Sequence, residues 1–397
     1  MLAIVNGKVL TITQGVKDNA TVLVKDGKIE AVGTDVEVPE EAEVVDATGK
    51  WVTPGLFDGH SHLGLFGEPR TRATSDGNEA TEPVTPQLRG IDSLNPQDPA
   101  YKDVLAGGVT TVYTQPGSAN IIGGTGMVIK LRGNTVDEMV VPGTEGMKMA
   151  LGENPKRVYG QGRSKMPATR MGNAAILRDA LVSARNYLEK MERYEDKAEE
   201  DEDATPPDRN LKWESLAKVL TGEMTAHIHC HRADDIITAI RIAEEFDINY
   251  TLEHVTEGYK IKDVLAEKDV PCIVGPLLMG RGKMELKDVT IKNAGIMARA
   301  GVKVCIQMDT SSGTRWLRDV TGIAVREGMP EEEALKAITI YPAEAMGVAD
   351  RMGSLDEGKD ADIAIFDGNP LSNLSKCLKT FIEGDVVYDV EKDDCLA

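Results

Sequence analysis

The chain has 397 residues, a length that allows one large domain and one small domain. Its content of 41% hydrophobic and 28% charged residues is typical of a soluble globular protein. The formal net charge of -20 argues against binding to nucleic acid or to an anionic membrane, and the aromatic content of 4% argues against stacking on single-stranded bases.

The N-terminal residues and the cysteines bear on the cellular compartment. No apolar run approaches the length of a membrane span, and no basic segment precedes a long apolar stretch as in a signal peptide. The cysteines are scattered and odd in number, which argues against a disulfide framework. They are Cys230, Cys272, Cys305, Cys377 and Cys395. These features predict a cytoplasmic protein.

The two ends of the chain predict a β domain. Residues 1–50 consist of short β-branched runs that are separated by hairpin signals such as Asn6-Gly7 and Asp26-Gly27. The C-terminal segment has the same pattern around Asp367-Gly368. Because chain termini often lie close together, we expect residues 1–54 and 345–397 to form one small, discontinuous β-sandwich domain.

The middle of the chain, residues 55–344, alternates β-branched runs with helical stretches such as Asp235–Phe246. Repeated βα units over this length predict an α/β fold, a (β/α)8 TIM barrel. An open doubly wound sheet is the alternative, which is disfavoured because no GxGxxG motif opens a helix after the first strand. The predicted parallel strands include Val109–Tyr113, Ile248–Leu252, Pro271–Val274 and Val302–Gln307.

Two segments fit neither domain. Residues 63–108 are rich in Pro, Asn, Asp and Thr and are longer than most loops, so we interpret them as a lid or a substrate-contacting loop. Residues 189–208 contain an acidic run and paired prolines, which predict a frayed helix end and a mobile surface loop.

The stretch GLFDGHSHLG places His60 and His62 two residues apart at the end of an apolar run. On a strand both imidazoles leave the same face, where a divalent metal would organise them. A chance pair on a polar strand end is the alternative. Asp58, beside this pair, is either a hydrogen-bond partner of a ligand histidine or a turn residue.

Further histidines and one aspartate also follow predicted strands. His227, His229 and His231 alternate in AHIHCHRADD, and only the last two are close enough to the strand end to reach a barrel mouth; we expect His227 to be a deeper core residue. His254 lies just beyond an apolar strand, and Asp309 ends another, where it is either a site residue or a helix cap. Together they predict a metal site.

These motifs resemble the amidohydrolase superfamily, metal-dependent hydrolases that include imidazolonepropionase, adenine deaminase, dihydroorotase and prolidase-like enzymes. The resemblance covers both ends and most of the middle of the chain. It implies a TIM barrel beside a β domain built from both termini, and homo-oligomers are frequent in the superfamily. The similar stretches are VLVKDGKIEAVG, GKWVTPGLFDGHSH, GVTTV, HIHCHRADD, LEH and GSLDEGKDADIAIFDGNP.

The resemblance also assigns roles to residues. It implies that His231 contacts the substrate, and that a glutamate or a carboxylated lysine bridges two metals. Glu153 in LGEN is similar to the glutamate of the adenine deaminase LGE motif and is preferred for the bridge, with Lys148 as the alternative. The implied metal ligands are His60, His62, Glu153, His229, His254 and Asp309.

The expected cofactor is Zn²⁺, one or two ions, with Mn²⁺, Fe²⁺ or Co²⁺ as alternatives. A metal-bound hydroxide would attack a small-molecule substrate, Asp309 would pass the proton of the water to the leaving nitrogen, and the metal and His231 would polarise the carbonyl. This predicts hydrolysis of a C–N bond in an amide or cyclic amide. Deamination of a nitrogen heterocycle is one alternative, and a non-catalytic scaffold is another, disfavoured because the ligands are retained.

Basic residues bear on the substrate. They follow the Glu153 region and a later strand, where they would bind a substrate carboxylate or simply face solvent; the second interpretation is favoured. The residues are Lys156, Arg157, Arg163, Lys165, Arg170, Arg281 and Lys283.

Overall fold

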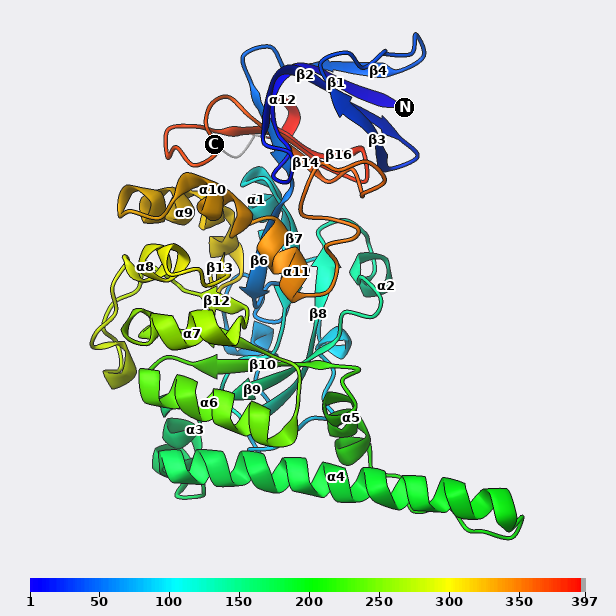
Figure 1. Ribbon diagram of the computed structural model, residues 1–397, viewed down its shortest axis with the longest axis vertical. Coiled ribbons are helices and arrows are strands. Elements are labelled where there is room, and N and C mark those ends of the chain that lie inside the picture. Colours follow the sequence, from blue (N-terminus) through cyan, green and yellow to red (C-terminus); the bar gives the residue numbers. More distant parts are fainter. Residues whose placement is uncertain (394–397) are drawn as a thin grey trace.

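The computed structural model describes residues 1–393, so Cys395 lies outside the described residues. Two eight-stranded sheets form the framework of the molecule. Figure 1 shows the sheet built from the two termini at one end, the second sheet in the middle and the long helix α4 (Arg170–Glu200) at the opposite end. Within the described residues, no helix combines the length and the apolar character that a membrane crossing needs.

The terminal sheet joins strands from both ends of the chain. Strand β5 pairs antiparallel with β14, with Pro54 opposite Ile363, so strands from both ends of the chain lie in one sheet. Its separate core includes Ile4, Val22 and Phe381. The description as a β-sandwich of residues 1–54 and 345–397 stays a prediction. The strands are β1 (Leu2–Leu10), β2 (Val16–Lys25), β3 (Lys28–Gly33), β4 (Glu43–Asp46), β5 (Trp51–Pro54), β14 (Ile363–Phe366), β15 (Cys377–Ile382) and β16 (Asp385–Asp389).

The middle sheet is a nearly closed barrel in which β6 to β13 follow one another in chain order. Backbone hydrogen bonds between the carboxyl ends of β6 and β13, the first and last strands, close the sheet toward a barrel. The Asp309 amide donates to His60 O at 3.3 Å, and the His62 amide donates to Thr310 O at 3.1 Å. The architecture agrees with a TIM barrel. The strands are β6 (Leu56–Ser61), β7 (Val109–Thr114), β8 (Ile122–Lys130), β9 (Gly146–Ala150), β10 (Thr225–Cys230), β11 (Tyr250–His254), β12 (Cys272–Val274) and β13 (Val304–Ile306).

One strand corrects the expectation of an all-parallel barrel. Strand β8 pairs antiparallel with both β7 and β9. Only residues 115–121 connect β7 to β8, and a parallel pairing needs a crossover of a dozen or more residues. The short connection therefore forces the chain to turn straight back.

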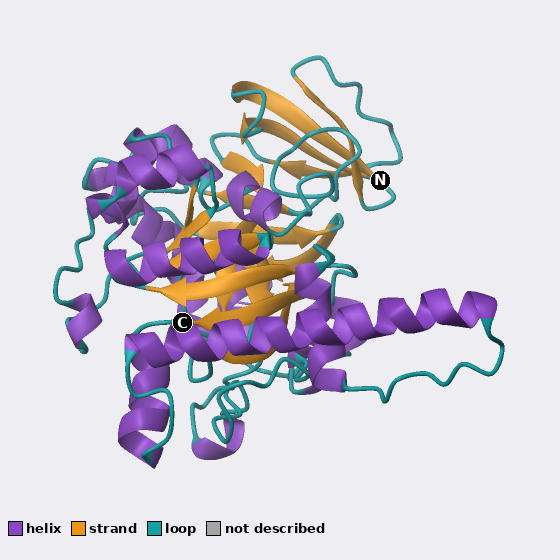
Figure 2. Cartoon of the chain, turned by 60° about the horizontal axis from the view of Figure 1, so that its bottom comes forward, coloured by secondary structure: helices purple, strands orange, loops and turns teal. Residues whose placement is uncertain are grey.

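Helices cover the outside of the barrel, as Figure 2 shows. Helix α6 confirms its prediction, because Ile236, Ile240 and Ala243 are buried on one face. The helices besides α4 are α1 (Ala100–Ala106), α2 (Val136–Met139), α3 (Glu153–Lys156), α5 (Leu211–Leu220), α6 (Ala233–Phe246), α7 (Lys262–Lys268), α8 (Asn293–Arg299), α9 (Leu317–Arg326), α10 (Glu331–Lys336), α11 (Ile340–Ala345) and α12 (Val390–Asp393).

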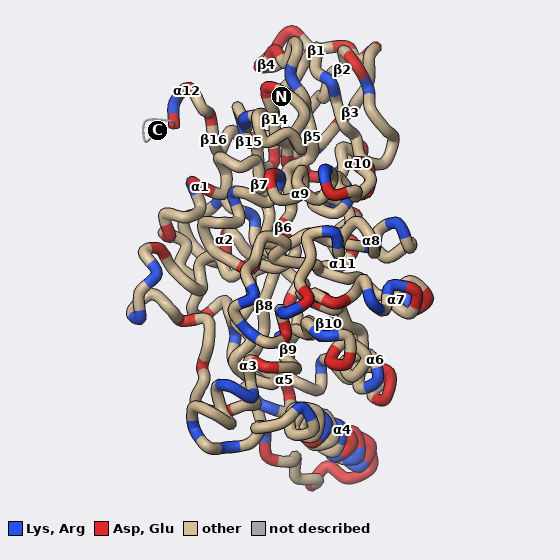
Figure 3. The backbone as a smooth tube through the Cα atoms, turned by 90° about the vertical axis from the view of Figure 1, so that its left-hand side faces the viewer, with Lys and Arg blue, Asp and Glu red and all other residues tan. Residues whose placement is uncertain are grey.

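The two unassigned segments are more regular than their composition indicates. Residues 63–108 end in helix α1 and pair with β8 at Val84 and Arg89. Helix α4 begins at the Thr169 cap and continues through the acidic run to Glu200, where a frayed end is expected from the sequence. Figure 3 shows acidic and basic residues mixed along α4, and the chain forms i,i+4 pairs there such as Arg193 with Glu189.

Lys130, the last residue of β8, links the barrel to the terminal sheet. Its Nζ donates to Asp360 at 2.7 Å and to Glu383 at 2.8 Å, and it lies 3.2 Å from Asp362. Burial alone would lower the pKa of Lys130, but Asp362 and Asp360 raise it above its usual value. The buried ammonium is thus compensated by carboxylates from the segments beside β14 and β16.

Replacing Lys130 with Met should lower the free energy of unfolding by about 3–5 kcal/mol, because buried carboxylates lose their partner. Urea unfolding followed by circular dichroism measures this loss. Lys28→Met is the matched control: Lys28 contacts the same Asp360, but its side chain is 49% exposed. We expect the control to lose about 1 kcal/mol or less, and equal losses in both variants would contradict the role given to Lys130.

Candidate metal centre

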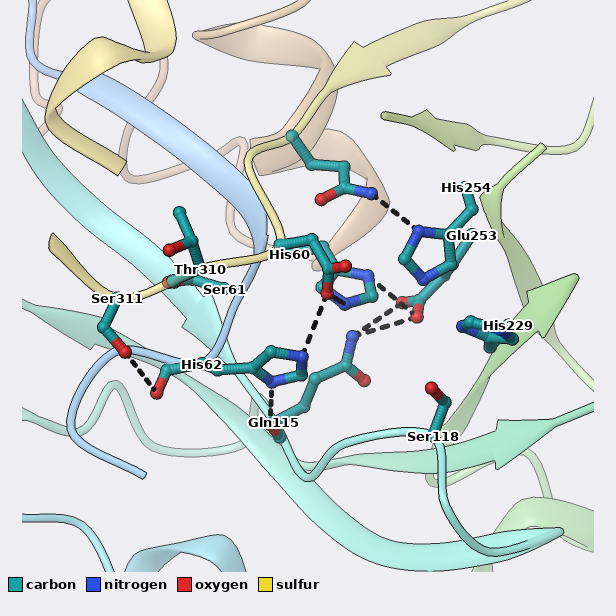
Figure 4. Close-up of polar contacts among 12 residues, drawn as sticks. His60, Ser61, His62, Gln115, Ser118, His229, Glu253, His254, Thr310 and Ser311 are labelled. Carbon is teal, nitrogen blue, oxygen red and sulfur yellow. Dashed lines mark hydrogen bonds and ion pairs between the residues drawn. The ribbon is translucent and has the colours of Figure 1, made fainter. Parts of the chain in front are cut away.

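Two histidines at the end of β6 meet one carboxylate. The two-residue period of the strand sends His60 and His62 to the same side. Their Nε2 atoms lie 3.3 and 3.0 Å from the same oxygen, Oδ1 of Asp309. Asp309 has a φ of 53°, so the chain turns sharply where it leaves β13. Figure 4 shows His60 and His62 reaching into one space from neighbouring positions.

The position of the ring proton decides what His62 can bind. Its Nδ1 lies 2.7 Å from the carbonyl oxygen of Gln115, and because a carbonyl only accepts, Nδ1 carries the proton. The tautomer of His62 that binds a metal then presents the lone pair of Nε2 to a carboxylate oxygen. Two lone pairs at this distance repel each other unless positive charge lies between them. The donor set therefore fits a divalent cation.

Histidines on β10 and β11 extend the ligand set. Nδ1 of His254 lies 2.9 Å from the carbonyl oxygen of Gly275, which leaves the lone pair of Nε2 free. Nδ1 of His229 has no hydrogen-bond partner within residues 1–393. Among the described residues, two groups have ligand atoms within 4.8 Å of one another: His60, His254 and Asp309, and His229, His231 and His254.

The backbone around His254 is strained. His254 has a φ of 69° and Val255 a φ of 45°, which a β-branched residue rarely adopts. On a regular strand, Glu253 and His254 would face opposite sides. Here both lie beside His60: Glu253 Oε2 is 3.0 Å from its Nδ1, and the ring centroid of His254 is 4.8 Å away. The left-handed conformation thus brings two neighbouring side chains into one site.

The ionisation states suit metal binding. Burial lowers the pKa of His229 and His231 well below the usual value and that of His254 to about 3, so these rings are neutral at pH 7. Neutral imidazole is the form that binds metals. Desolvation would raise the pKa of Asp309, but His254, His60 and His62 hold it well below its usual range. The site therefore combines the neutral rings of His229, His231 and His254 with an ionised carboxylate.

Glu253 is a site residue that the sequence analysis missed. It is fully buried, its Oε2 accepts from Lys148 Nζ at 2.7 Å, and Gln115 Nε2 donates to both of its oxygens. Burial would raise the pKa of Glu253, but Lys148 and His60 hold it well below its usual range. The sequence feature that could have indicated this residue is its position: an acidic residue directly before His254 at the end of a predicted strand.

Glu153, the preferred bridging ligand, lies at the start of α3. Its Oε2 accepts from the amide of Glu285 at 3.2 Å, and its own amide donates to Glu285 Oε2 at 2.8 Å. Neither ligand group of the described residues contains Glu153. Lys148, the alternative, points into the barrel and contacts Glu253.

The two remaining candidates lie next to the site. His227 is deeper in the barrel, where its Nδ1 is 2.9 Å from Thr251 Oγ1 and its ring packs on Tyr113, as expected for a core residue. Asp58 accepts from the backbone amide of His60 at 3.1 Å, so it orients the backbone of this residue rather than its ring. Burial raises the pKa of Asp58 to about 7.

Several of the basic candidates have structural partners. Arg170 Nε contacts both oxygens of Asp235 at 3.0 Å. Arg281 Nε donates to the carbonyl oxygen of Lys287 at 2.8 Å, and Arg163 lies over the ring of Tyr159. These contacts favour the interpretation in which the basic stretch does not bind substrate.

Comparison with known proteins identifies the family. A family model described as "Amidohydrolase family" matches residues 51–387. The amidohydrolase tasK of Hapsidospora irregularis is 29% identical over 93% of this chain, which spans 40% of the length of tasK. An imidazolonepropionase of Geobacillus sp. is 27% identical over 88% of this chain and 84% of its own. The crystal structure of an amidohydrolase from Thermotoga maritima is 45% identical, with a TM-score of 0.93 over 98% of this chain and 100% of that chain. The matched residues include every strand of the barrel and every histidine of the site, and the chain belongs to the Amidohydrolase family.

Proposed function

We propose that the protein hydrolyses a C–N bond, in an amide or cyclic amide, of a small-molecule substrate at a divalent metal centre. The observation that carries this proposal is the convergence of His60, His62, His254 and Asp309 on one space at the carboxyl ends of the barrel strands. This is the end at which barrel enzymes place their catalytic groups. The family match and the names amidohydrolase and imidazolonepropionase of its relatives support the same chemistry.

The ligands of the cation are side chains from four strands or strand ends. Zn²⁺ suits a set rich in imidazole, and Mn²⁺, Fe²⁺ and Co²⁺ are the alternatives. A divalent cation supplies two things when bound: it lowers the pKa of water and it polarises a carbonyl oxygen. Of the two bridging candidates only Lys148 reaches into the barrel beside His60, and it would bridge two ions only once carboxylated, a form that lacks the ammonium paired here with Glu253. The proposed ligands are His60, His62, His229, His254 and Asp309.

Asp309 moves the proton. Its side chain is 30% exposed, more than that of His60 or His62, so it borders the space that water and substrate enter. As an ionised carboxylate it accepts a proton from the attacking water while the C–O bond forms. It then returns that proton to the nitrogen as the C–N bond breaks, giving a carboxylic acid and an amine.

The alternative functions are less well supported. Deamination was suggested by the LGE motif, but the carboxylate of Glu153 is engaged with Glu285. A product assay on small amides, cyclic amides and purines separates the two, because amide hydrolysis forms a new carboxylate and amine whereas deamination releases ammonia. A non-catalytic scaffold would not need neutral rings beside an ionised Asp309. A cytoplasmic location and a homo-oligomeric state stay predictions.

Asp309→Asn should lower kcat/KM by about 10²–10⁴-fold, the usual contribution of a positioned acid–base group. Asp247→Asn is the matched control: Asp247 has the same left-handed conformation, with a φ of 54°, and is exposed at the end of α6. Asn tolerates this conformation, so both variants should fold. Steady-state kinetics and circular dichroism measure the two effects, and an active Asp309→Asn enzyme would remove Asp309 from the mechanism.

Removal of metal by a chelator should abolish hydrolysis while circular dichroism shows that the fold remains, because the barrel core does not depend on the cation. Adding back Zn²⁺, Mn²⁺ or Co²⁺ should restore turnover. Elemental analysis of the purified protein gives the identity and number of bound ions. Protein that contains no divalent metal and binds none on titration would favour the scaffold alternative.

A further inference from the structure

Strand β10 offers two histidines to a metal, His229 at position five of the strand and His231 just beyond its end. Both lie close to His254: the ring centroids are 4.2 Å from His229 and 4.6 Å from His231. One nitrogen of each of the three rings lies within 4.8 Å of the others. By distance alone, His231 is as well placed to bind the cation as His229. Another contact must distinguish them.

That contact comes from Lys283, in the segment after β12. Its Nζ lies 2.5 Å from Oε1 of Glu285, 3.1 Å from Oδ1 of Asn154 and 3.2 Å from Nε2 of His231. The first contact is an ion pair and the other two are hydrogen bonds, so three partners surround the ammonium. The side chain is only 16% exposed. Lys283 is thus held in place, and it is not a mobile surface cation.

Glu285 anchors Lys283 from the other side. It is 1% exposed, and its Oε2 accepts from the backbone amide of Glu153 at the start of α3. The amide of Glu285 donates back to the Glu153 carboxylate. This reciprocal pair ties the segment after β12 to the segment after β9. The ammonium therefore has a fixed position against His231.

The consequence for His231 follows from its two ring nitrogens. Nε2 accepts from Lys283, so the proton of the neutral ring is on Nδ1, which lies 2.7 Å from Thr256 Oγ1 and donates to it. No ring lone pair is then left for a metal. The fixed ammonium also repels a second cation at this distance. No hydrogen bond from an ammonium is made to His229: its Nε2 lies 3.5 Å from the neutral amide of Asn154.

We propose that Lys283 is a positioning residue that assigns the metal ligand of β10: it withholds His231 from the cation and leaves His229 to bind it. His231 then remains on the substrate side of the centre. This inference rests on the proposed metal centre. It further implies that His229, His231 and His254 form a latent three-histidine site, which only the ammonium of Lys283 keeps closed.

Lys283→Met should open this latent site. We expect the affinity of the chelator-treated protein for Zn²⁺ to rise at least about tenfold, the scale on which groups around a site alter metal affinity. The visible absorption of bound Co²⁺ should also change, because the ion gains a nitrogen ligand. Adding His231→Asn to Lys283→Met should reverse both effects. Lys287→Met is the matched control, since Lys287 lies on the same segment with a side chain that is 54% exposed.

A second measurement needs no change at Lys283. In the otherwise unchanged protein, His229→Asn should weaken Zn²⁺ binding by more than about 100-fold, whereas His231→Asn should weaken it by less than about tenfold. Equal losses, or a Lys283→Met protein that binds Zn²⁺ and Co²⁺ like the parent, would overturn the assignment of Lys283. Failure of the parent protein to bind any metal would instead overturn the proposed function itself, so the two failures are distinguishable.

Discussion

The site depends on one electrostatic constraint, the need for positive charge between the imidazoles of His60 and His62 and the carboxylate of Asp309. Nδ1 of His62 donates a hydrogen bond to a backbone carbonyl, so the metal-binding tautomer of this ring presents the lone pair of Nε2 to Asp309 Oδ1, 3.0 Å away. His60 places its Nε2 3.3 Å from the same oxygen. In a water-poor barrel mouth such an arrangement is costly unless a cation lies within it. The strands that meet there are therefore organised around a charge that the chain itself does not supply.

A buried ion pair, Glu253 with Lys148, lies next to the ligand histidines. Glu253 balances Lys148 and contacts His60 from below, and Gln115 donates to Glu253 while its backbone carbonyl accepts from His62. The same few groups thus satisfy buried polar atoms and orient the ligand rings. Around the mouth, Lys283 does the same for His231. His62 and His254 are each oriented by a backbone carbonyl from another segment, which makes the geometry of the centre a property of the closed barrel.

The terminal sheet is joined to the barrel by buried ion pairs that lie away from the proposed metal centre. Lys130 ends β8, the one strand that runs against its neighbours, and its ammonium is held by carboxylates next to β14 and β16. The left-handed residues His254 and Asp309 lie at the opposite end of the barrel, where the parallel strands end. A rigid framework is needed there, because left-handed conformations of non-glycine residues persist only where the surrounding structure holds them.

The amino-acid sequence by itself determined the pattern of strands, the shared face of His60 and His62 and the position of His229 and His254 at strand ends, because side-chain period and turn residues are local properties. It did not show the direction of β8, which depends on the length of its connection, nor the place of Glu153. Glu253 escaped it, and Lys283 was named only as a possible substrate contact or solvent-facing residue, for the same physical reason. Their roles come from partners more than fifty residues away, such as Lys148 and His231, and only the closed barrel brings those charges within hydrogen-bond distance.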